Sequence, residues 1–162
     1  MIRYNRLITF KVIDKYSNQP IGSIKDVLYS EDYSRVDYLI IKNNKLIRNK
    51  FIVEYDGLCF NKDNKVFLAN RLDTVDNKLD RYIEKTIEGY KLINKEIKNE
   101  DGECIGFVRD VVINGKDGKV EGFIITEGLF EDLFYGRNYI PLIDTIYINE
   151  QCIFVPSNIL SS

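Results

Sequence analysis

The chain contains 162 residues, of which 44% are hydrophobic, and it carries a formal net charge of −2 at neutral pH. This length and composition suit one ordinary domain or two small ones, with enough apolar material for a packed core. The sequence contains no histidine, which is the usual general base near neutral pH and the commonest metal ligand. Histidine-based catalysis and metal binding are therefore excluded, whereas chemistry based on carboxylates, lysines or tyrosines stays open.

No segment predicts export or membrane insertion. No apolar run approaches the roughly 20 residues of a membrane-spanning helix, and residues 1–6 lack the apolar core of a signal peptide. Cys59, Cys104 and Cys152 stand far apart and form no Cys-x-x-Cys pair, a pattern that fits a reducing compartment. We expect a cytoplasmic protein, with peripheral contact to a membrane as an option.

Residues 1–72 read as short β-strands rich in Val, Ile, Phe and Tyr, separated by turn signals. The expected strands are Ile8–Asp14, Ile21–Tyr29, Val36–Lys42, Phe51–Glu54, Leu58–Phe60 and Val66–Leu68. Short strands packed into so few residues cannot leave long edges exposed. A small closed or nearly closed β-barrel is therefore expected.

The periodicity changes in residues 73–90, where apolar residues recur at helical spacing. Thr74 and Gly89 suit the start and the end of a helix. The apolar stripe consists of Val75, Leu79, Tyr82, Ile83, Ile87 and Tyr90. We expect a short linker helix that packs on one barrel or on both, and a docking helix for a partner protein is the alternative.

Residues 91–162 repeat the plan of residues 1–72. The segment 21–29 (IGSIKDVLY) matches 105–113 (IGFVRDVVI) at a spacing of 84 residues, and the same spacing carries VDYLII, which begins at Val36, onto VEGFII, which begins at Val120. The shared pattern is Ile-Gly-x-apolar-basic-Asp-Val-apolar. The sequence therefore predicts two tandem copies of one mainly β module.

A later block, 51–56 (FIVEYD), matches 139–144 (YIPLID) at a spacing of 88 residues. This spacing implies four extra residues in the preceding loop of the second copy.

The pattern Ile-Gly-x-Ile-x-Asp-Val, a turn, and then Val-x-x-Leu-Ile-Ile resembles the PRC-barrel family. This module occurs in the cytoplasmic part of the photosynthetic reaction centre H subunit and at the C-terminus of the ribosome maturation factor RimM. Both copies match the pattern, and 139–144 is similar to the family's aromatic-apolar-Pro strand, with Val53 in place of the proline in the first copy. The resemblance implies two small barrels that act as binding or scaffold modules, with no catalytic residue to carry over.

Gly22 and Asp26 in the first copy correspond to Gly106 and Asp110 in the second. We interpret the glycines as positions of close backbone approach and the aspartates as acceptors for turn amides. Two carboxylates could act as an acid and base pair only across one cleft, and nothing in the sequence brings these two together.

The loop 42–50 is a candidate surface for anion contact. Residues 1–70 carry 12 basic and 8 acidic side chains, whereas residues 71–162 carry 11 and 17, so the basic excess is local. The candidate contacts are Lys42, Lys45, Arg48 and Lys50. The loop could meet RNA or an anionic membrane surface, where each charge would contribute about 1 kcal/mol at the lipid surface. A solvated hairpin is the alternative.

The corresponding loop of the second copy, 126–138, is longer, acidic and aromatic. The candidate docking residues are Leu129, Phe130, Asp132, Leu133, Phe134 and Tyr135. These side chains could bind a partner protein, or they could close a barrel end or touch the other copy. Because the two loops have opposite charge, they could also pair between domains or between subunits.

Together these features predict a non-catalytic binding or scaffold module that acts through protein–protein contacts. The partner is a protein of unknown identity, and self-association is an option. Contact with RNA, a ribosomal particle or an anionic membrane through residues 42–50 is the alternative. The sequence holds no Gly-rich phosphate loop, EF-hand pattern or metal-ligand cluster, so no cofactor, metal or small-molecule substrate is implied.

Overall fold

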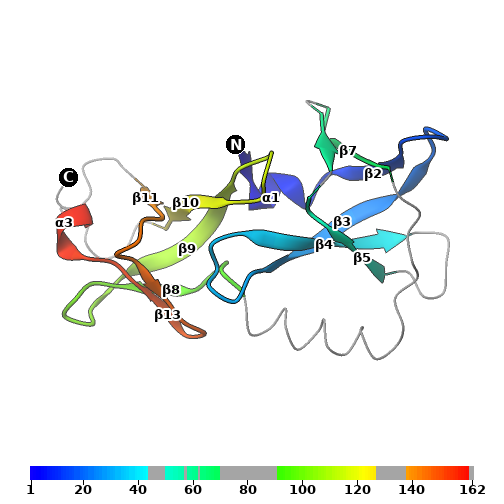
Figure 1. Cartoon of the computed structure of the whole chain (residues 1–162). Helices are drawn as coiled ribbons and strands as arrows, with labels where there is room; N and C mark the ends of the chain where they lie inside the picture. Colours follow the sequence, from blue (N-terminus) through cyan, green and yellow to red (C-terminus); the bar gives the residue numbers. More distant parts are fainter. Residues whose placement is uncertain (44–49, 57, 62, 70–90, 127–137, 161–162) are drawn as a thin grey trace.

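The computed structural model of the chain describes residues 1–43, 50–56, 58–61, 63–69, 91–126 and 138–160. These residues form two β-rich halves that lie side by side (Figure 1). The predicted mainly β, two-module architecture is confirmed. The predicted linker helix, 74–89, lies outside the described residues.

Six strands of the first copy form one sheet in the order β5-β4-β3-β2-β7-β6. They are β2 (Lys11–Asp14), β3 (Pro20–Tyr29), β4 (Val36–Asn43), β5 (Lys50–Glu54), β6 (Cys59–Phe60) and β7 (Lys65–Leu68). Strands β2 and β7 pair in parallel, and the other pairs are antiparallel. The predicted strands of this copy are confirmed, except that the first begins at Lys11 and not at Ile8.

The later start has a local cause. Residues Tyr4–Leu7 form a short helix, α1, and a turn follows it in which the Phe10 amide donates to the Leu7 carbonyl. The backbone of residues 8–10 therefore closes this turn, and the strand starts after it.

The second copy repeats the strand order as β11-β10-β9-β8-β13-β12, with β8 and β13 again parallel. Its strands are β8 (Glu96–Lys98), β9 (Cys104–Ile113), β10 (Val120–Ile125), β11 (Tyr139–Pro141), β12 (Tyr147–Ile148) and β13 (Cys152–Phe154). A short helix, α3 (Ser157–Leu160), follows. The duplication is therefore complete at the level of strand order and direction.

The strand register corrects the predicted spacing of 88 residues. Ile40 pairs with Ile52 in the first copy, and its equivalent Ile124 pairs with Tyr139 in the second, a difference of 87 between the partners. The spacing of 88 was wrong by one residue, because both segments are apolar at successive positions, FIV at 51–53 and YIPLI at 139–143, and such runs can be matched one residue apart by sequence. The second loop therefore has three extra residues, and Glu54 stands at the position of Pro141.

The N-terminus crosses from the first copy to the second. Strand β1 (Ile2–Arg3) pairs with β9, with Ile2 opposite Ile113. Helix α1 then leads back to β2 in the first sheet (Figure 1). The first residues of the chain thus belong to the sheet of the second copy.

The turns between the equivalent hairpin strands pair with each other across the two copies. Arg35 forms an antiparallel bridge with Lys119, its own equivalent at a spacing of 84. The Val36 amide donates to the Gly118 carbonyl and the Val120 amide donates to the Ser34 carbonyl, both at 2.8 Å. Because equivalent residues exchange equivalent bonds, a pseudo-two-fold axis passes between the copies.

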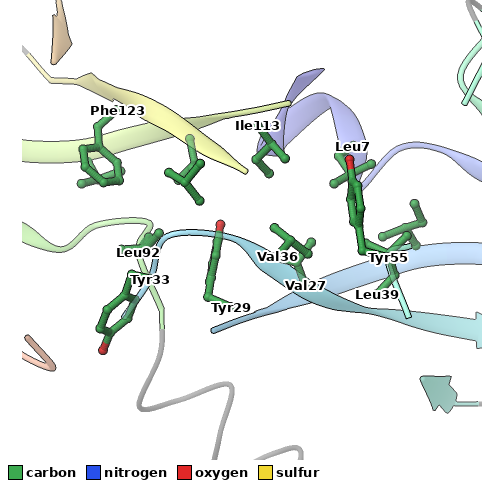
Figure 2. Close-up of a cluster of buried hydrophobic side chains, with 14 of the residues drawn as sticks. Leu7, Val27, Tyr29, Tyr33, Val36, Leu39, Tyr55, Leu92, Ile113 and Phe123 are labelled. Atoms are coloured by element: carbon green, nitrogen blue, oxygen red, sulfur yellow. The ribbon is translucent and has the colours of Figure 1, made fainter. Parts of the chain in front are cut away.

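A single hydrophobic core continues through this contact. Figure 2 shows Tyr29 and Val36 of the first copy facing the side of the second copy that carries Ile113 and Phe123. Tyr33, also buried, lies under the ammonium of Lys95, which is 5.3 Å from the ring centroid. The two modules therefore form one packed body.

Gly118 offers a test of this contact. Its φ is +75°, and a Cβ there would lie 2.7 Å from the Val36 carbonyl oxygen and 2.9 Å from the Tyr55 ring. We expect Gly118→Ala to lower the free energy of unfolding by about 2–4 kcal/mol, from backbone strain plus overpacking. Urea denaturation measures this loss.

Gly102→Ala is the matched control, because Gly102 has a φ of +81° but nothing within 4 Å of an added Cβ. It should cost only the strain, about 1 kcal/mol. Equal losses in the two variants would contradict the tight contact between the copies.

Candidate functional site: the junction of the two copies

The predicted site residues are only partly described. Lys42 and Lys50 are cross-strand partners near the end of β4 and at the start of β5, and Lys42 is exposed. Two basic residues are thus placed opposite each other at this end of the strand pair. Lys45 and Arg48 lie outside the described residues, as do all six predicted docking residues of the segment 127–137.

The repeated glycine has the role of close backbone approach that the sequence predicted, whereas each repeated aspartate accepts a bond from an amide inside its own strand and not from a turn amide. A Cβ on Gly22 would overlap the Lys42 carbonyl, so only glycine allows β3 and β4 to approach there. The basic residue before each aspartate lies at a register shift in its strand. Each aspartate then accepts a bond from the next amide, Val27 to Asp26 at 2.8 Å and Val111 to Asp110 at 2.9 Å.

Helix α1 bonds to both of these aspartates. The Tyr4 hydroxyl donates to Asp26 Oδ1 at 2.9 Å, and the Asn5 amide donates to Asp110 Oδ1 at 3.0 Å. The adjacent residues Tyr4 and Asn5 therefore bring the two repeat carboxylates to one junction. Sequence reasoning missed this arrangement, because the carboxylates are 84 residues apart and the connecting residues precede the repeat.

A pocket of about 260 Å³ opens at this junction. It is lined by Tyr4, Asp26, Val27, Tyr29 and the segment 91–94, so both copies contribute to its wall. The Tyr29 side chain is buried, and its hydroxyl has no hydrogen-bond partner among the described residues. Burial raises the pKa of Tyr29 well above its usual value, and the nearby Tyr4, Asp26 and Asp110 raise it further.

A second, mostly apolar groove of about 390 Å³ lies on the outer face of the second copy. It is lined by Met1, Ile2, Arg3, Val112, Ile124 and Tyr139. Tyr139 is 41% exposed and Met1 is 89% exposed. Sequence periodicity did not find this groove, because its wall joins the N-terminus to strands more than a hundred residues away.

The described residues contain no group of three or more Cys, Asp or Glu side chains that could hold a metal ion. In the same part of the chain, no helix is long and apolar enough to cross a membrane.

Comparison with protein families agrees with this geometry. The model of the PRC-barrel domain matches twice, at residues 1–75 and 84–156, and so covers each six-stranded unit. The chain belongs to the PRC-barrel family. PRC-barrel domains are generally non-catalytic modules that interact with protein or RNA. No curated protein matches the chain.

Membership of the PRC-barrel family explains the repeated motif but not the junction. The glycine and aspartate shape one strand within each PRC barrel. The pocket and the groove both need residues from more than one part of the chain, since β1 and α1 contact the second PRC barrel.

Alkaline pH tests the burial of Tyr29. A phenol whose pKa is raised in the folded state favours folding fully below its unfolded pKa, near 10, and this contribution is lost as the pH rises above that value. We expect the free energy of unfolding to fall above pH 10, with Tyr29 contributing about 1 kcal/mol of the loss by pH 11.

Denaturant unfolding at pH 9 and pH 11 measures this loss. Tyr29→Phe should reduce it, whereas Tyr16→Phe, which changes an exposed ring, should leave it as in the unmodified chain. The same loss in all three proteins would show that Tyr29 is not buried as described.

Proposed function

We propose that the protein is a cytoplasmic, non-catalytic scaffold that binds an apolar segment of another protein on the outer face of its second barrel. The single observation that carries this proposal is the apolar groove beside Tyr139 and Ile124.

The difference between the two copies supports an interaction at the groove. The corrected register makes Val112, Ile124 and Tyr139 the equivalents of Leu28, Ile40 and Ile52. In the first copy Leu28 and Ile40 are 7% and 1% exposed and pack with Ile52 as a separate outer cluster. In the second copy Val112 is likewise buried, but Ile124 is half-buried and Tyr139 is 41% exposed. The same face is therefore partly open there, and exposed apolar area can mark an interaction surface.

The predicted docking segment connects β10 to β11, the two strands that carry Ile124 and Tyr139 of the groove wall. Ile124 lies near the end of β10 and Tyr139 begins β11, so two residues of the groove wall come shortly before and shortly after the segment 127–137 in the chain. The apolar residues that the sequence singled out there are thus candidates to extend the same surface.

Anion contact through the basic loop 42–50 is the second candidate function. The cross-strand pair of Lys42 and Lys50 favours it. Such contact would weaken steeply as salt rises, whereas an apolar contact would not.

Affinity capture with the intact chain separates these functions. The groove variant is Ile124→Gln with Tyr139→Gln. Its matched control is Phe107→Gln with Tyr147→Gln, which removes exposed apolar side chains of the same copy that do not line the groove. A variant of the basic loop, Lys42→Glu with Lys50→Glu, tests anion contact.

We expect the intact chain and the control variant to capture one protein partner at high salt. The amount captured by the groove variant should be at least tenfold lower. The proposal would be overturned in favour of anion contact if the groove variant still captures the partner, whereas high salt and the Lys42→Glu/Lys50→Glu variant abolish the capture. If the groove variant does lose the partner, a variant of the segment 127–137, Leu129→Ala with Phe130→Ala, shows whether that segment extends the groove surface.

A further inference from the structure

We infer that Asp110 is a positioning residue of the apolar groove: it holds the N-terminal strap, residues 1–5, whose first three residues form one side of that groove. This inference rests on the function proposed above, because it names the residue that assembles the proposed binding surface. The groove then depends on a long-range contact, since Asp110 follows Asn5 by 105 residues.

The strap supplies half of the lining of the groove. Met1, Ile2 and Arg3 are three of its six lining residues, and the other three lie on β9, β10 and β11. Ile2 and Arg3 form β1, which pairs with β9 over these two residues. Strands in globular proteins usually have about 3–10 residues, so a strand as short as β1 needs further contacts to stay in place.

The bond between Asn5 and Asp110 is such a contact. The Asn5 amide donates to Asp110 Oδ1 at 3.0 Å, and the Asn5 side chain donates to the Arg109 carbonyl at 3.2 Å. A hydrogen bond to a carboxylate is about twice as strong as one between neutral groups. Asp110 is only 6% exposed, and the low dielectric of a buried site strengthens the bond further. The chain is thus held at a point two residues after β1.

The same carboxylate lies beside the floor of the groove. Asp110 is the cross-strand partner of Ile124, the lining residue on β10. The register of β9 and β10 shifts directly after this pair. Asp110 Oδ1 accepts a bond from the Val111 amide at 2.9 Å beside this irregularity. One oxygen therefore holds both the strap and the local backbone of the strand on which the strap rests.

Asp26, the equivalent residue of the first copy, provides a matched control. It accepts the same local bond, from the Val27 amide at 2.8 Å. Its other bond comes from the Tyr4 hydroxyl and not from a backbone amide next to β1. Among the described strands, β3 pairs with β2 and β4 only. Removal of the Asp26 carboxylate therefore tests the loss of the local bond while the anchor at Asn5 stays.

Two NMR signals in the full chain report the docked strap. A Cβ added to Gly115 would lie 3.1 Å from Ile2 Cδ1, so the Ile2 δ-methyl lies against Gly115 and should give a nuclear Overhauser effect to its α-protons. Hydrogen exchange of the Asn5 amide reports the bond to Asp110. We expect Asp110→Ala to abolish the Overhauser effect and to speed the exchange of the Asn5 amide at least tenfold.

Asp110→Asn should rescue both signals, because asparagine keeps a side-chain oxygen that can accept from the Asn5 amide. Asp26→Ala should leave both signals as in the unmodified chain. Since Asp110→Ala removes a buried side chain from β9, Asn5→Pro is the second variant. It removes the amide donor in the first turn of α1, where proline is tolerated, and leaves β9 unchanged. It should abolish the Overhauser effect of Ile2 as well.

A neutral peptide with blocked ends, acetyl-Leu-Gly-Leu-Gly-Leu-amide, probes the assembled groove. Binding is followed by the amide shifts of Ile124 and Tyr139, which line the groove. We expect saturable shifts in the unmodified chain, in Asp110→Asn and in Asp26→Ala. Binding to Asp110→Ala should be at least fivefold weaker, because one side of the groove is lost with the strap.

The inference is overturned if Asp110→Ala or Asn5→Pro keeps the Overhauser effect of Ile2, or if Asp26→Ala loses both signals as Asp110→Ala does. It is also overturned if the strap detaches and the peptide still binds as tightly. Absence of peptide binding to the unmodified chain would contradict the proposed function alone, because the two NMR signals need no ligand and still decide whether Asp110 holds the strap.

Discussion

The antiparallel pairing of two equivalent turns, residues 34–36 and 118–120, is the interaction on which the rest of the structure depends. Each turn supplies one amide and one carbonyl to the other, so neither barrel presents these groups to solvent. The pairing fixes a pseudo-two-fold axis, and the axis in turn brings the two glycine–aspartate strands to one junction. Helix α1 can bond to Asp26 and Asp110 at once only because the barrels are held in this orientation.

Much of the fold was predictable from the sequence, for identifiable physical reasons. Short β-branched runs between turn residues located the strands, and Gly22 had the close backbone approach that its chemistry favours. The register of β11 was not predictable, because the segments to be matched are apolar at successive positions and so align almost equally well one residue apart. The crossing of Ile2 to the second sheet, the pocket and the groove depend on long-range contacts that leave no periodic signal.

Duplication gives this PRC-barrel protein a symmetric frame, and the departures from symmetry provide its candidate binding surfaces. The outer cluster around Ile40 is closed in the first copy, whereas the same face beside Ile124 forms a groove in the second. Likewise Asp110 receives a cross-copy amide, whereas Asp26 faces a pocket. In both comparisons the backbone is alike and the binding chemistry differs. Side-chain substitution can thus change these surfaces without changing the fold.

The central claim is that the two barrels form one body joined through their turns. Native-state hydrogen exchange of the Val36 and Val120 amides tests it most directly, since both N–H groups donate across the junction. If the claim is right, these amides exchange only through global unfolding, with the same opening free energy as the core amides of Leu39 and Phe123. Exchange of Val36 and Val120 through a low-energy opening, while Leu39 and Phe123 stay protected, would contradict it.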